Sequence, residues 1–154
     1  NKQEKSMEEL SIEKKGYSVW SAPQTFIATF LGGPLAGCYL ISDNYKALNN
    51  PQFAKRALWA GVIGTAALFL LRFILEAFFP NLFEQIPPSV IAATACVLVL
   101  SHADIYQKKP IKELRKAGSL RNSYFKLIPV VLVSILSMFA LAFIYGMLHA
   151  IVFE

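Results

Sequence analysis

The chain has 154 residues, of which 55% are hydrophobic and 16% are charged, and its formal net charge is +5. Soluble domains carry about 25% charged residues, and here the charges are segregated: residues 24–42 and 127–153 have none, whereas Lys108–Lys126 contains seven Lys and Arg. This pattern is typical of an integral membrane protein and argues against a nucleic-acid-binding protein, which would need a soluble basic module.

Residues 1–20 form a polar tail in which four lysines oppose four glutamates. Ser6-Met7-Glu8-Glu9 has the form of a capping box, which favours a short surface helix. A disordered tail is the alternative, because terminal polar segments are often poorly ordered. No apolar run follows a basic start, so we do not expect a cleaved signal peptide. Tyr17 and Trp20 are typical of a water–lipid interface, and residues 21–154 are expected to form the membrane domain.

The first apolar segment, about residues 23–42, is interrupted at its centre by Gly32-Gly33-Pro34. As a span, its length of 20 residues matches a hydrocarbon core of about 30 Å, and Pro34 would kink the helix. As a re-entrant hairpin, the Gly-Gly-Pro sequence would be the turn, and both ends would lie on one side. We favour the span, and the hairpin remains the alternative.

Small residues make one face of this segment unusually flat. Gly33 and Gly37 form a G-x-x-x-G pair, which lets another helix approach closely. This face predicts either helix packing within the protein or a surface for a ligand, a partner or a second copy. The candidate packing and interaction residues are Gly32, Gly33, Pro34, Ala36 and Gly37.

The second apolar segment, about residues 55–79, contains an ionic pair. Asn50-Pro51 is a favourable helix start. Arg72 and Glu76 are four residues apart and therefore lie on one helix face. Ionisable groups at membrane depth are costly, so the pair is either a structural ion pair between helices or a functional polar site.

The remaining apolar segments are about residues 87–105 and 124–153. Cys38 and Cys96 lie inside apolar runs and are expected to be small packing residues. His102 and Asp104 point about 200° apart on a helix, so they do not converge as metal ligands. His149, near the far end of the last helix, is the third member of a candidate polar set with Arg72 and Glu76.

The basic loop at Lys108–Lys126 is expected to rest on anionic lipid headgroups. With the first segment spanning, the loops at residues 42–56 and 106–126 carry most of the Lys and Arg and are predicted to be cytoplasmic, which puts both termini outside. With the first segment re-entrant, the tail joins the cytoplasmic side.

Several short motifs resemble the opening of a group of small bacterial inner-membrane proteins. The resemblance rests on the stretch Ala28–Gly37 (ATFLGGPLAG), which contains a T-F-x-G-G-P-L-A pattern, on the preceding Trp20–Gln24, and on Asn44-Tyr45 before Ala47-Leu48. Asn49 stands where that group has a glycine. The resemblance covers about the first third of the chain after the tail; it implies a multi-span bacterial membrane protein and no particular activity.

The sequence therefore predicts an all-α polytopic membrane protein with four hydrophobic helices in one bundle, the first broken or kinked at Gly32-Gly33-Pro34. No catalytic motif is present, so we expect a protein that is not an enzyme and that uses no cofactor or metal. The function we predict is an accessory or assembly subunit that binds a membrane-protein partner or a second copy through the Gly32–Gly37 face. The alternative is a small oligomeric transporter or channel that uses the broken first helix and Arg72 with Glu76.

Overall fold

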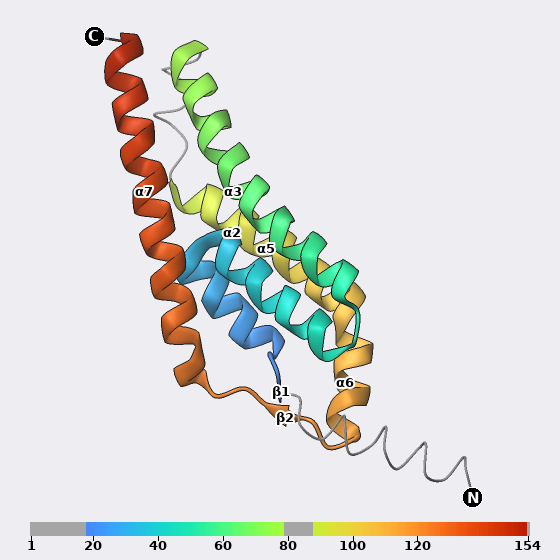
Figure 1. Ribbon diagram of the computed structural model, residues 1–154. Helices are drawn as coiled ribbons and strands as arrows, with labels where there is room; N and C mark the ends of the chain where they lie inside the picture. The colour runs from blue at the N-terminus through green and yellow to red at the C-terminus, as the bar shows by residue number, and fades with distance from the viewer. Residues whose placement is uncertain (1–17, 79–87, 154) are drawn as a thin grey trace, which may run out of the picture.

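The computed structural model of the chain describes residues 18–78 and 88–153, which are predominantly helical (Figure 1). The all-α fold is confirmed. The expectations for Ser6–Glu9 and for Tyr17 lie outside the described residues. The elements are β1 (Ser18–Val19), α2 (Ala22–Ala47), α3 (Pro51–Phe78), α5 (Pro88–His102), the π-helical turn η1 (Ala103–Gln107), α6 (Lys108–Lys116), β2 (Leu120–Arg121), the 3-10 turn η2 (Tyr124–Lys126) and α7 (Leu127–Phe153).

Among the described residues, three helical segments are long and apolar enough to cross a membrane if only length and composition are counted: Ala22–Ala47, Pro51–Phe78 and Tyr124–Ile151. Helix α5 has 15 residues and is therefore about 22 Å long, less than a hydrocarbon core of about 30 Å. The predicted count of four apolar helices is thus slightly too high.

Helix α2 consists of two helical halves joined by a sharp turn at Gly33. The backbone of Gly33 has φ 71° and ψ −172°, a conformation that is open essentially only to glycine. Pro34 then begins the second half, where its missing N–H is not needed.

The two ends of α2 lie together. A straight helix of 26 residues would hold its ends about 39 Å apart, yet the Trp20 backbone N–H donates to Asn44 Oδ1 over 2.7 Å. The chain therefore rises and returns, as Figure 1 shows for the blue and cyan halves of α2. The break predicted at Gly32-Gly33-Pro34 is thus confirmed. Each half is only about 16–21 Å long, which is shorter than a hydrocarbon core of about 30 Å and favours the re-entrant alternative over a single straight span.

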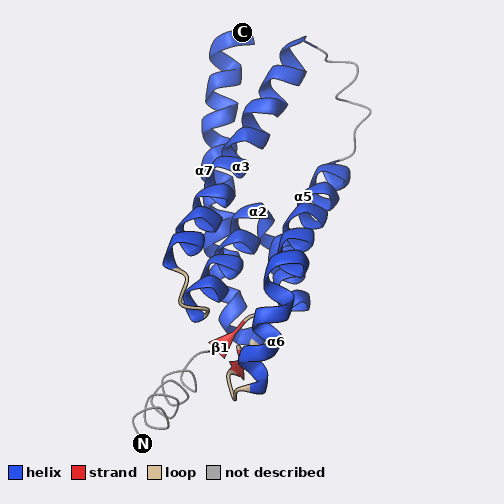
Figure 2. Ribbon diagram, turned by 90° about the vertical axis from the view of Figure 1, so that its right-hand side faces the viewer, coloured by secondary structure: helices blue, strands red, loops and turns tan. Residues whose placement is uncertain are grey.

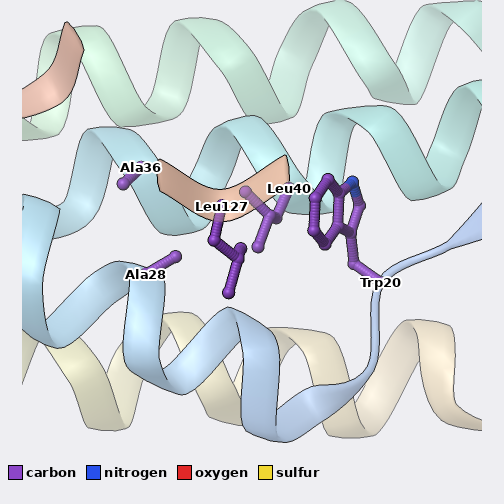
Figure 3. Packing of buried hydrophobic residues seen from close by; sticks show 5 residues of the cluster. All are labelled: Trp20, Ala28, Ala36, Leu40 and Leu127. Carbon is purple, nitrogen blue, oxygen red and sulfur yellow. The ribbon is translucent and has the colours of Figure 1, made fainter. Parts of the chain in front are cut away.

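Small side chains let the two halves of α2 pack against each other. Gly37 faces Thr29 so closely that a Cβ at Gly37 would collide with Thr29 Oγ1, and it would lie 2.8 Å from Val99 Cγ1 of α5. Ala28 and Ala36, one from each half, have no exposed surface. Figure 3 shows the cluster that they form with Trp20, Leu40 and Leu127.

Helices α3 and α7 are the long pair of the fold, and they extend beyond the hairpin toward the C-terminal end (Figures 1 and 2). They meet in their far halves, where the rings of Phe69 and Tyr145 lie 6.4 Å apart. Only 11% of the apolar stretch of each helix is buried inside the protein, against 50% for α2. The hairpin is thus the core of the fold, while α3 and α7 present most of their surface outward.

The opposite end of the molecule is basic. Strand β1 pairs in parallel with β2, matching Ser18 to Leu120 and Val19 to Arg121. Helix α6 closes this end by burying Leu114 against Val19 and Ala47. Ten of the eleven Lys and Arg in the described part of the chain lie at this end or within two turns of it; the eleventh is Arg72.

Asn49, in the turn between α2 and α3, has a positive φ of 55°. Glycine adopts this left-handed conformation without strain, and Asn tolerates it better than most other residues. Asn is therefore one of the few residues other than glycine that suit this turn.

Candidate functional site

Helices α3 and α7 bring a polar cluster together in their far halves. Arg72 and Glu76 form the ion pair expected from their spacing: Arg72 Nε and Nη2 donate to Glu76 Oε1 over 3.0 and 2.9 Å. From α7, Tyr145 lies under the Arg72 guanidinium, whose carbon is 5.3 Å from the ring centroid. The His149 ring is 6.1 Å from the Tyr145 ring.

The three polar residues proposed from the sequence therefore line one cavity of about 450 Å³, together with Tyr145. Tyr145 was missed by the sequence analysis. Its position four residues before His149 places both on one face of a helix, and that spacing was the signal available. The sequence around Tyr145 is so apolar that a single tyrosine there is normally interpreted as a packing residue.

The cluster is incompletely covered by the protein. The side chains of Arg72 and Glu76 are 47% and 23% exposed, and Arg72 lies six residues, or about 9 Å, before the end of α3. Tyr145 Oη is buried and has no hydrogen-bond partner among the described residues. Because buried polar atoms are nearly always paired, this hydroxyl marks a place for a further polar group.

The chemistry open to this site is binding by charge, hydrogen bonds and cation–π contact. Arg72 can donate to an acceptor from another molecule, and Tyr145 Oη can donate or accept. In residues 18–78 and 88–153, no group of three or more His, Cys, Asp and Glu side chains is placed to hold a metal ion.

The small-residue face proposed from the sequence lies inside the fold. Gly32 and Gly37 are buried, and a Cβ on Gly32 would lie 3.2 Å from the Cβ of Ser134 in α7. Pro34 begins the returning half of the hairpin, next to the turn at Gly33. Gly32, Ala36 and Gly37 therefore pack α2 inside the fold, whereas Gly33 and Pro34 are partly exposed at the turn.

A buried network of amides at the basic end was also missed. Asn44 Nδ2 donates to the Trp20 carbonyl over 3.1 Å and to Gln107 Oε1 over 3.2 Å. Gln107 Nε2 donates in turn to the Ile41 carbonyl over 2.8 Å. The π-helical turn η1, which ends at Gln107, places this amide against the hairpin.

A second branch ties the start of α2 to the segment before α7. Gln24 Nε2 donates to the Asn122 carbonyl over 2.6 Å, and Ser18 Oγ donates to Asn122 Oδ1 over 2.7 Å. These side chains satisfy backbone groups or one another, so the network is structural. Its members are 24 to 104 residues apart, a separation that periodicity does not reveal.

The remaining candidates have packing or local roles. The Tyr45 hydroxyl lies 3.3 Å from His102 Nε2. Cys96 is buried and Cys38 is partly buried, and neither forms a disulfide. Cys38 sits where α3 comes close, because a Cβ on Gly61 would lie 2.6 Å from the Cys38 Cβ.

Comparisons of the chain with protein-family models, with curated proteins and with solved structures find no match.

Proposed function

We propose that this protein is a non-catalytic accessory subunit of a bacterial inner membrane, which binds a larger membrane protein along the far halves of α3 and α7. The observation that carries the proposal is the polar cluster of Arg72, Glu76, Tyr145 and His149. A half-exposed ion pair in an otherwise apolar helix is costly when it faces lipid. A partner helix with a polar side chain would cover the exposed part of this pair.

The low burial of α3 and α7 supports the same proposal. With 11% of each apolar stretch buried, most of their surface is free for lipid or for another protein. We therefore propose that the partner protein binds on the α3–α7 side and not at the Gly32–Gly37 face, most of which packs inside the fold.

The proposed orientation places the basic end in the cytoplasm. The loops at residues 42–56 and 106–126 contain nearly all the Lys and Arg of the described chain, and such loops are retained on the cytoplasmic side. The polar cluster then lies in the outer half of the membrane.

A photo-crosslinking amino acid at Gly146 tests the proposal. Gly146 lines the cluster cavity, and a side chain there meets nothing within 4 Å, so the fold should accept it. Ile144 is the matched control, since it is exposed and lies about 200° around the helix from Gly146. In native membranes we expect one defined membrane protein to be crosslinked from Gly146 and not from Ile144. Crosslinking to lipid alone from both positions would contradict the proposal.

The alternative, an oligomeric transporter or channel, is favoured by the same cluster if the second molecule is another copy. Arg72 and His149 of several copies would then line a shared polar path. Crosslinking from Gly146 to a second copy, together with solute flux in proteoliposomes that Arg72→Leu abolishes, would establish this alternative in place of the accessory role.

A further inference from the structure

The basic end contains a second cavity, separate from the polar cluster, between the start of α2 and helix α6. Its volume is about 610 Å³. Figure 2 shows α6 at this end of the molecule, beside β1. The cavity does not overlap the surface proposed above for a partner protein.

The wall contributed by α6 is cationic. Lys108, Lys112, Arg115 and Lys116 all line the cavity. On a helix these positions fall within about 100° of arc, whereas Lys109 and Glu113 lie outside it. No Asp or Glu is among the described residues that line the cavity, so the wall complements an anion.

Part of the opposite wall is apolar, beside the polar side chains of Ser21, Thr25 and Asn44. Ala22 and Pro23, at the start of α2, line the cavity together with Trp20. Phe26, four residues after Ala22, continues the same helix face and is 44% exposed. Its ring stacks on that of Phe30, with centroids 6.1 Å apart, so an apolar track leads from the cavity along α2.

The features of this cavity correspond to the parts of a phospholipid. The cationic wall suits a phosphate, and the apolar residues of the cavity and along α2 suit an acyl chain. We infer that this cavity binds a single anionic phospholipid, whose phosphate contacts the α6 cations and whose acyl chain follows Phe26 and Phe30. A soluble phosphate would contact the cations but would make no contact with the apolar side chains along α2, so it would match only part of the site. Each cation near an anionic lipid adds to the affinity.

Native mass spectrometry of the full-length protein in neutral detergent tests this inference, with phosphatidylglycerol and phosphatidylcholine as the probes. We expect one phosphatidylglycerol retained per chain and no comparable retention of phosphatidylcholine. The variant Lys112→Gln/Arg115→Gln should weaken phosphatidylglycerol binding about 30-fold.

The matched control is Lys55→Gln/Lys109→Gln, which removes the same charge from exposed positions outside the cavity. It should retain the lipid as the unchanged protein does, and both variants should keep the same melting temperature. Equal losses in the two variants would reduce the effect to general charge attraction and overturn the site.

Glycerol 3-phosphate separates a lipid site from a soluble-anion site. At millimolar concentration it should fail to displace phosphatidylglycerol, because it lacks the acyl chain. Displacement at that concentration, or equal binding of phosphatidylcholine, would also overturn the inference.

Discussion

Asn44 joins the two ends of the α2 hairpin by pairing with both backbone groups of Trp20. Its Oδ1 accepts from the Trp20 N–H over 2.7 Å, and its Nδ2 donates to the Trp20 carbonyl over 3.1 Å. The Asn44 amide thus forms hydrogen bonds with the backbone N–H and C=O of Trp20, a residue 24 positions earlier in the sequence. This relationship decides that the first apolar segment turns back.

Replacing Asn44 should therefore destabilise the fold strongly. Asn44→Leu has a similar volume, but it leaves the Trp20 backbone groups and Gln107 Oε1 without their partner. An unpaired buried polar group costs about 1–3 kcal/mol, so we expect the melting temperature in detergent to fall by about 10 °C. Asp43→Asn is the control, since it keeps an acceptor for Trp20 Nε1; an equal fall there would contradict the special role of Asn44.

Three glycine-to-alanine variants should have different outcomes. Gly37→Ala should destabilise by about 1–3 kcal/mol because it overpacks the contact with Thr29. Gly33→Ala should also destabilise, because its φ of 71° is unfavourable for alanine. Gly64→Ala, with nothing within 4 Å, should stabilise α3 by up to about 1 kcal/mol. Thermal melting of the three variants checks the order, and equal effects at Gly37 and Gly64 would rule out close packing at Gly37.

The conformation of Asn49 gives a smaller, local prediction. With φ at 55°, Asn49→Gly should be neutral or slightly stabilising. Asn49→Val should lower stability by about 1–2 kcal/mol, because a β-branched residue is strained in the left-handed region. Both variants are compared by melting temperature; a better tolerated valine than glycine would refute the backbone argument.

The hairpin favours the re-entrant alternative for the side of the membrane on which the N-terminal tail lies. Because both ends of α2 lie at the basic end, Ser18 lies at the same end as α6, and we expect the tail on that side of the membrane. In a Cys38→Ala/Cys96→Ala background, Ser6→Cys and Ala117→Cys should both resist an impermeant maleimide in intact cells, whereas Gln85→Cys should react. All three should react after permeabilisation. Labelling of Ser6→Cys without Ala117→Cys would show that α2 spans after all.

The ion pair on α3 should matter for association more than for stability. Replacing both partners of an ion pair by apolar residues leaves no unpaired charge and is often neutral or stabilising, so the melting temperature of Arg72→Leu/Glu76→Leu should not fall by more than about 2 °C. The same variant should lose the partner crosslink from Gly146. A retained crosslink would show that the pair does not make the interface.

The sequence alone predicted an all-α chain and the approximate positions of its long helices, but it did not predict helix α6 (Lys108–Lys116), which lies in the segment expected to be a basic loop. Long uncharged runs and a basic loop are local properties of composition, and they predict a membrane-embedded all-α chain without knowledge of any contact. The Arg72–Glu76 pair was also predictable, because four residues make slightly more than one helical turn. Pro51 likewise indicates the start of α3, through the fixed φ and missing N–H of proline.

Only the tertiary structure decided how these helices are arranged. Gly32-Gly33-Pro34 is compatible with a kinked span and with a turn, because both conformations accommodate the missing N–H of proline and the flexible backbone of glycine. The choice rests on Asn44, Gln107 and Gln24, whose amides form hydrogen bonds with residues 24 to 98 positions away. His149 joins Arg72 by the packing of α7 on α3 in the same way. Such long-range contacts have no period along the chain, so they become visible only when the fold brings their partners together.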